Sequence, residues 1–238
     1  MYLAIRLAVP ILFAAWMFQQ VRKPSGPLGR RVVRAMNLSH ATMTTWGLQL
    51  LNVPKNSSIL DIGCGGGQTV HTLAALAPEG EVVGLDYSPA SVAVSRDTNA
   101  TDIAAGRVRI EQGSVAALPF PDRTFDIVTA VETHYYWPDL PANVREVLRV
   151  LKPGGTFALI AETYRGGPFR LLYSMIMPLL RAAFLSDQEH RDLLTQGGFT
   201  EVTTHHQAGK NWIVAIGRRP FQAQSEIAFH KTEGICRA

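Results

Sequence analysis

Acidic residues are missing from the first quarter of this 238-residue chain. No aspartate or glutamate precedes Asp61, whereas residues 1–60 hold seven lysines and arginines. Residues 61–238 carry 16 basic and 19 acidic side chains, so a basic front end precedes a mildly acidic remainder. This asymmetry indicates an anionic partner, which could be a membrane surface or nucleic acid.

Cysteine is scarce as well. The two that are present, Cys64 and Cys236, cannot form a disulfide framework. Cys64 lies inside a glycine-rich turn where a bridge would obstruct a ligand, so we expect a reducing, intracellular setting. No cysteines and histidines follow the spacing of a zinc site, and we expect no bound metal.

The chain also lacks the apolar run of about 20 residues that a membrane-spanning helix needs. Its longest apolar run, residues 7–18, is shorter and is followed by Arg22 and Lys23. A signal peptide is disfavoured, because the start carries little charge and no clean Ala-x-Ala site follows. We expect residues 1–22 to form a hydrophobic helix. It would either anchor the protein on an anionic membrane surface or pack on the domain or on a partner.

The most informative segment that is present covers residues 59–67. An apolar run ends in Asp61, and glycine then occupies positions 63, 65, 66 and 67, where it permits positive φ and close approach by a ligand. A buried strand, this turn and a helix over 68–77 would form a nucleotide site of the α/β type. A dinucleotide fingerprint would need glycine in place of Gln68 or Val70, which disfavours a nicotinamide-dependent reductase.

Alternating strands and helices follow this turn. The second strand, 81–86, ends in Asp86, whose carboxylate can accept hydrogen bonds from ribose hydroxyls. Further strands are predicted at 107–112, 125–131 and 156–161, helices at 143–151 and 187–198, and a closing antiparallel pair at 199–206 and 210–217. This order predicts an α/β fold: a Rossmann-like, doubly wound, mainly parallel seven-stranded sheet with a C-terminal antiparallel strand.

Several of these motifs together resemble the class I S-adenosylmethionine (SAM)-dependent methyltransferases. They are the acid two residues before Gly-x-Gly-x-Gly, Asp86, and the segments 118–126 and 149–155. Within that group the chain looks like the ubiquinone/menaquinone C-methyltransferases and related small-molecule enzymes. The resemblance covers 57–162 and implies SAM as cofactor. It also implies methyl transfer to a small, apolar or membrane-associated acceptor.

Two alternatives remain open at this point. An RNA methyltransferase is disfavoured, because the chain has neither an Asn/Asp-Pro-Pro-Tyr nor a Pro-Cys signature and its catalytic part is net acidic. A non-catalytic SAM-binding interaction protein would keep the cofactor motifs without turnover. Nucleic acid is therefore an improbable partner, and a small-molecule acceptor is the expected one.

The resemblance also assigns cofactor contacts to particular residues. These residues lie at or just after the ends of the first four predicted strands. They are Asp61, Gly63, Cys64, Gly65 and Gly67 for the first strand, Asp86, Tyr87 and Ser88 for the second, Gly113, Ser114 and Val115 for the third, and Glu132 for the fourth. Related enzymes usually carry an acid at position 114. We therefore expect the adenine contact from the Ser114 hydroxyl and the Val115 N–H.

The acceptor is expected near residues 132–139, after the fourth strand, where open α/β sheets bind ligands. His134 could take a proton from a substrate, because its ordinary pKa near 6.5 suits a general base. Tyr135 and Tyr136 could form an aromatic wall against the substrate. In the alternative interpretation these side chains only cover the hydrophobic edge between strand and helix.

The domain organisation follows from these assignments. A turn-rich linker at 23–29 leads to a helical stretch at 30–51, so residues 23–56 are expected to form a helical cap. The methyltransferase domain covers 57–218 and includes an apolar insertion at about 164–185 that resembles a lid. Residues 219–238 are expected to form a loosely ordered tail. The expected location is the cytoplasm, with association at the cytoplasmic face of a membrane as one option.

Overall fold

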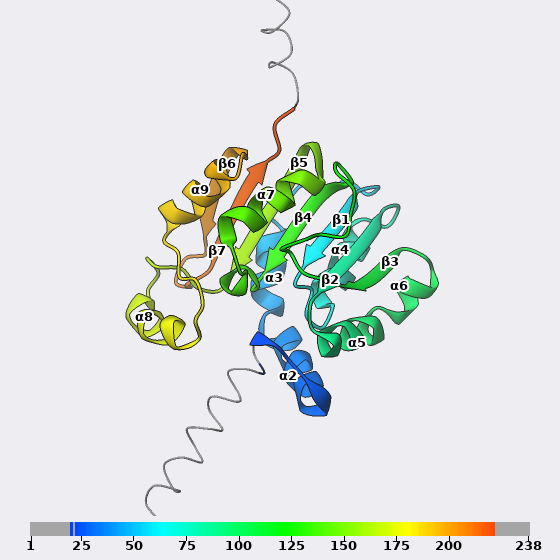
Figure 1. Ribbon diagram of the computed structural model, residues 1–238, viewed down its shortest axis with the longest axis horizontal. Coiled ribbons are helices and arrows are strands. Elements are labelled where there is room, and N and C mark those ends of the chain that lie inside the picture. The colour runs from blue at the N-terminus through cyan, green and yellow to red at the C-terminus, as the bar shows by residue number, and fades with distance from the viewer. Residues whose placement is uncertain (1–19, 21, 222–238) are drawn as a thin grey trace, which may run out of the picture.

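The structure is a computed structural model that describes residue 20 and residues 22–221 (Figure 1). The expected anchor at 1–22 and the tail at 219–238 thus lie largely outside the described residues. Among the helices of the described part, none has the length and apolar character needed to cross a bilayer.

Seven strands form one sheet in the order β3-β2-β1-β4-β5-β7-β6. β1 to β5 are parallel, and β7 is antiparallel to both β5 and β6. The strand bounds are β1 Ser58–Ile62, β2 Glu81–Asp86, β3 Val108–Gln112, β4 Phe125–Val131, β5 Leu151–Ala161, β6 Thr200–His206 and β7 Ile213–Arg218. The predicted Rossmann-like fold class is confirmed.

Helices cover both faces of this sheet (Figure 1). Side chains alternate between the faces along each strand, so Leu60 and Ile62 join one apolar core and Ile59 joins the other. The helix bounds are α2 Gly26–Ser39, α3 Ala41–Leu48, α4 Gln68–Leu76, α5 Pro89–Thr98, α6 Ala100–Ala104, the 3-10 turn η1 His134–Tyr136, α7 Leu140–Val150, α8 Arg170–Leu179 and α9 Asp187–Gln196. α3, α4 and α5 pack on one face, and α7 and α9 on the other.

The structure differs from the sequence expectations at several boundaries, of which three lie near the start of α2, at His40 and at the start of β5. The linker expected at 23–29 is half helical, because α2 already begins at Gly26 with proline in its first turn, where the missing N–H costs nothing. The single helical stretch expected at 30–51 is divided at His40 into α2 and α3. Residues 152–155 belong to the start of β5, next to a register shift against β4, and do not form a loop before it.

Candidate active site

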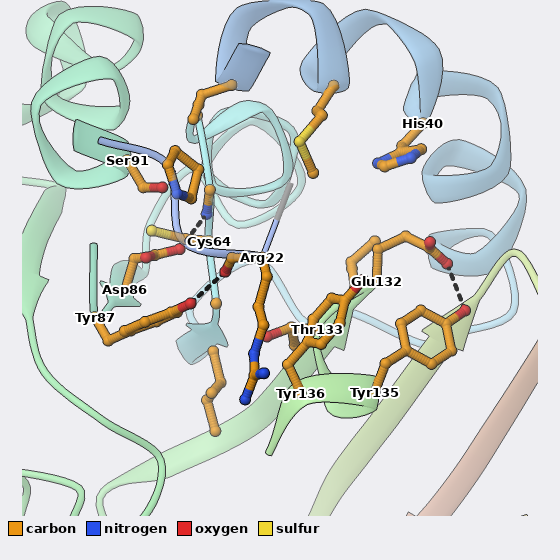
Figure 2. Close-up of a pocket in the computed structure, with 18 of the residues that line it drawn as sticks. Arg22, His40, Cys64, Asp86, Tyr87, Ser91, Glu132, Thr133, Tyr135 and Tyr136 are labelled. Atoms are coloured by element: carbon orange, nitrogen blue, oxygen red, sulfur yellow. Dashed lines mark hydrogen bonds between the residues drawn. The ribbon is translucent and has the colours of Figure 1, made fainter. Parts of the chain in front are cut away.

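A cavity of about 860 Å³ opens at the carboxyl ends of the parallel strands (Figure 2). The turn after β1 and the residues that follow β2, β3, β4 and β5 form its floor, while α2, α3 and α8 contribute its upper walls. This edge of a doubly wound sheet is where ligands bind, because neighbouring strands lead into helices on opposite faces there.

The glycine turn meets the two requirements expected of it, positive φ and close approach. Gly65 has φ +52°, and a Cβ added there would meet no atom within 4 Å, so its backbone is open to a ligand. Gly63 has φ +71°, and a Cβ there would approach Thr133 Oγ1 to 2.1 Å. The N–H groups of Gly63 and Cys64 donate to the Leu85 carbonyl at 2.7 and 3.0 Å, which ties the turn to β2.

Asp86 lies at the carboxyl end of β2 with its carboxylate held from both sides. Gly65 N–H donates to Oδ2 at 2.9 Å, and Ser88 N–H donates to Oδ1 at 2.8 Å. Burial raises the pKa of this carboxyl, and the two N–H donors lower it. Each oxygen keeps a lone pair for a further donor, so the geometry suits a pair of ribose hydroxyls.

The remaining residues at this end of the cavity come from β2 and β3. Tyr87, Gly113, Ser114 and Val115 line it, as expected from the resemblance. The Ser114 hydroxyl accepts a bond from Ala116 N–H at 3.2 Å. Their contacts with a cofactor stay predictions.

Other expected cofactor residues lie behind the cavity wall. Asp61 is fully buried, accepts a 2.7 Å hydrogen bond from the Thr129 hydroxyl, and has a pKa raised to about 7, chiefly by burial. Ser88 caps α5 and donates to the Pro24 carbonyl at 2.7 Å. Gly67 precedes α4 with φ +81°. None of Asp61, Gly67 and Ser88 lines the cavity, and the contacts that the structure shows for them are structural, so their expected contacts with the cofactor stay predictions.

His134 is not where the sequence analysis expected it. Its ring is fully buried, does not line the cavity and packs against Tyr135 and His190, with ring centroids 4.2 and 5.4 Å away. Burial and the neighbouring His190 hold the pKa of His134 well below its usual range. Neither ring nitrogen has a hydrogen-bond partner among the described residues. The role of His134 as a general base or substrate contact is therefore wrong, because the 3-10 turn rotates the ring into the core.

Glu132, two residues earlier, faces the cavity instead. Its backbone has φ +56°, an uncommon conformation for a residue other than glycine and one often found at functional sites. Its Oε1 accepts hydrogen bonds from the Tyr135 hydroxyl, at 3.0 Å, and from the Glu162 N–H. Thr163 N–H donates in turn to the Tyr135 oxygen at 3.2 Å. Three residues that follow β4 and β5, Tyr135, Glu162 and Thr163, thus hold the Glu132 carboxyl group in place.

Glu132 belongs to a cluster with Glu162 and His40, whose ligating atoms all lie within 4.8 Å of one another. His40 Nε2 is 3.7 Å from Glu162 Oε2. The pKa of Glu132 is raised to about 8, first by burial and then by the charge of Glu162. Burial lowers the pKa of His40, while the charge of Glu162 raises it. The three groups are arranged either to share a proton or to hold a cation.

The wall beside this cluster is largely aromatic and apolar. It is formed by Tyr135, Tyr136, Trp137, Tyr173, Met177 and Leu180. The guanidinium of Arg22 lies 5.8 Å from the centre of the Tyr136 ring. Figure 2 shows Asp86 and Tyr87 at one end of the cavity and Glu132 and Tyr135 at the other. The cavity therefore has a polar end next to β2 and an apolar end next to β4 and β5, and the two ends are continuous.

Sequence reasoning did not assign roles to several residues that line the cavity. His40 and Asn37 come from α2 and its end, and Asn37 Nδ2 donates to the Gly66 carbonyl at 3.0 Å. Thr133 and Glu162 follow β4 and β5. Glu162 had a usable signal, since it is an acid at the carboxyl end of a parallel strand. His40 and Asn37 lie in the segment expected to form a cap, but the sequence did not single out either of them, because only the tertiary fold brings α2 onto the turn.

Comparison with known proteins agrees with this arrangement. Residues 60–159 match the family model described as a methyltransferase domain. The demethylmenaquinone methyltransferase of Listeria monocytogenes serotype 4a is 33% identical over 198 residues, which cover 78% of this chain and 83% of the relative.

Solved structures share the fold. Human N-acetylserotonin methyltransferase in complex with SAM has a TM-score of 0.68 at 18% identity, covering 81% of this chain and 56% of that one. A Haloferax volcanii methyltransferase solved with its activator Trm112 has a TM-score of 0.69 at 21% identity, covering 79% and 93%.

The cavity fits the cofactor that these proteins imply. The open backbone at Gly65 and the oriented Asp86 carboxylate suit the cofactor's methionine and ribose parts, and the polar end has room for its adenine. The cofactor is SAM, and the protein is an enzyme that uses it for methyl transfer. The chain belongs to the class I SAM-dependent methyltransferases, among which it resembles the menaquinone methyltransferases.

Proposed function

We propose that this enzyme methylates a small, apolar acceptor that carries an ionisable hydroxyl group, with Glu132 as the proton acceptor. The observation that carries the proposal is a carboxyl group of raised pKa, set in the aromatic end of the cavity beyond the cofactor's end. The relatives named demethylmenaquinone methyltransferase support an aromatic acceptor of this kind.

The order of the strands supports the division of the cavity. Asp86 ends β2 and Gly113 follows β3. The turn at Gly65 follows β1, and Glu132 and Glu162 follow β4 and β5. A cofactor with its ribose on Asp86 and its methionine part over the turn would extend toward β4. The acceptor then occupies the far end, below Tyr173 and Met177 of α8.

The chemistry needs few protein groups. SAM supplies the methyl group on a sulfonium, and the sulfur keeps the electron pair of the broken bond. The chain aligns the acceptor for in-line attack, excludes water and takes up the proton that the acceptor loses. The Glu132 carboxylate receives that proton, and the neighbouring Glu162 and His40 lie close enough to pass it toward solvent.

The test is the Glu132→Gln variant, assayed by formation of S-adenosylhomocysteine with naphthoquinol and other phenolic acceptors. We expect kcat to fall by about a hundredfold or more, the usual contribution of a positioned base. SAM affinity, measured by calorimetry, should stay within about threefold, since glutamine keeps the shape of Glu132 and an oxygen that can accept the same two hydrogen bonds. Glu79→Gln changes an exposed glutamate outside the cavity and is the matched control.

Other outcomes would contradict the proposal. Full activity in Glu132→Gln would show that Glu132 is not the proton acceptor. A loss of SAM affinity without loss of kcat would return Glu132 to the cofactor contact expected from the sequence. Activity abolished by a chelator and restored by Mg²⁺ would make the cluster a cation site.

A further inference from the structure

Helix α8 is apolar on both of its faces. Its inner face contributes Tyr173 and Met177 to the cavity wall, and Met177 is only 4% exposed. Its outer face carries four large apolar side chains, Leu171, Leu172, Met175 and Leu179, which are 76%, 55%, 72% and 74% exposed. A helix that is apolar on all sides is normally buried on all sides, so the exposed outer face of α8 indicates a binding partner.

The exposed side chains form a patch. The spacing of Leu171, Met175 and Leu179 is four residues, which places them in one row along the helix. Phe169, 54% exposed, precedes the helix and extends the apolar segment. Single exposed apolar residues need no explanation, whereas a cluster of this kind marks an interaction site.

The charge around the patch identifies the partner's chemistry. Residues 164–185 include three arginines and no acid. Arg165 pairs with Glu189, but Arg170 and Arg181 are exposed and have no carboxylate partner in the part of the chain that the structure describes. α2 lies at the same end of the sheet as α8 (Figure 1), and it carries the exposed Arg30 and Arg31 and no acid. Basic residues flanking an apolar helix face are complementary to an anionic lipid surface.

We propose that α8 docks on an anionic bilayer, with its outer face among the upper acyl chains and its arginines at the headgroups. The inner face of the same helix forms part of the cavity wall, so docking would bring the apolar end of the cavity to the lipid. An apolar acceptor could then enter from the bilayer without crossing water. The entry of an acceptor from the bilayer rests on the proposed function, whereas the docking of α8 does not depend on it.

The test compares full-length variants in flotation with vesicles of phosphatidylcholine alone or with one third phosphatidylglycerol. Met175→Ser/Leu179→Ser removes two outer-face side chains that do not line the cavity. We expect the wild type to bind the anionic vesicles and the variant to lose at least about tenfold in partition coefficient. Leu50→Ser/Leu76→Ser removes two exposed leucines away from α8 and should bind as the wild type does.

A second pair of measurements keeps the result interpretable. Unchanged SAM affinity and thermal unfolding in Met175→Ser/Leu179→Ser would show that its fold is intact. Arg170→Gln/Arg181→Gln should lose the preference for anionic over neutral vesicles, with weaker wild-type binding at high salt.

Equal partition of the Met175→Ser/Leu179→Ser variant and the wild type would overturn the proposal and assign any vesicle binding to residues 1–22. A wild type that ignores vesicles but dimerises through α8, judged by sedimentation, would overturn it in favour of a second copy. Vesicle binding is read without any acceptor, so a failure of the proposed methylation would leave this result unaffected.

Discussion

The Tyr135 hydroxyl donates a 3.0 Å hydrogen bond to the carboxylate of Glu132, three residues earlier in the chain. The pair is formed because Glu132 takes a positive φ at the end of β4 and the 3-10 turn then brings Tyr135 back beneath it. The bond stabilises the charged form of Glu132 and opposes the effect of burial on its pKa.

Removing this bond should shift the pH dependence of catalysis. In Tyr135→Phe the pKa of Glu132 should rise above about 8, because the charged carboxylate loses a donor. The rising limb of the kcat profile should move to higher pH, with kcat at pH 7 lower by about threefold to tenfold. Tyr164→Phe, outside the cavity, should keep the wild-type profile. If the rising limb of the kcat profile is unshifted in Tyr135→Phe, the group that titrates in this profile is not Glu132.

Replacing Asp86 should weaken cofactor binding. Asp86→Ala removes the carboxylate that Gly65 and Ser88 orient toward the cavity. We expect SAM affinity to fall by more than about tenfold, since at least one charge-assisted hydrogen bond is lost. Calorimetry measures the change, and Asp97→Ala, an exposed carboxylate beside Arg34, serves as control. Unaltered affinity in Asp86→Ala would contradict the ribose assignment.

Two glycines in the same turn should respond differently to alanine. A Cβ at Gly65 meets open space, so Gly65→Ala should lose about 1–2 kcal/mol of stability from its positive φ. Its main effect should be weaker SAM binding, because the methyl group points into the ligand's path. Gly63→Ala adds a clash with Thr133 and should cost clearly more stability. Urea unfolding and calorimetry on both variants test this, and equal effects would be inconsistent with the turn geometry.

The contribution of Asp61 and Glu132 to stability should fall as the pH rises from about 5 to 8. The pKa values of Asp61 and Glu132 are raised to about 7 and about 8, so in this range these two carboxyl groups bind more protons in the folded state than in the unfolded state. Their contribution to the free energy of unfolding decreases until both groups are ionised. The lowered pKa values of His40, His134 and His190 act in the opposite direction below about pH 6.5, so comparison with Asp61→Asn is what isolates the carboxyl effect. In Asp61→Asn the decrease between pH 6 and 7 should be smaller. Urea titrations at several pH values measure it, and an identical slope in wild type and Asp61→Asn would refute the linkage.

Much of the fold could be predicted from the sequence, because it depends on local signals. The strands at 81–86 and 125–131 have the predicted bounds, since their apolar runs are ended by clear turn signals. Residues 152–155 were assigned wrongly because Pro and Gly usually break a strand, whereas here a register shift against β4 accommodates them.

By itself, the sequence determined the cofactor. The glycine turn and Asp86 are the groups that we propose to recognise it, through backbone shape and one carboxylate, and both lie at the ends of strands that the sequence pattern predicts. Only the tertiary structure decided which acid–base group lines the cavity. His134 and Glu132 are two residues apart, and either side chain could act as an acid or base. The backbone conformation places the His134 ring in the core and the Glu132 side chain in the cavity. His40 and Glu162, 122 positions apart in the chain, meet there through packing alone.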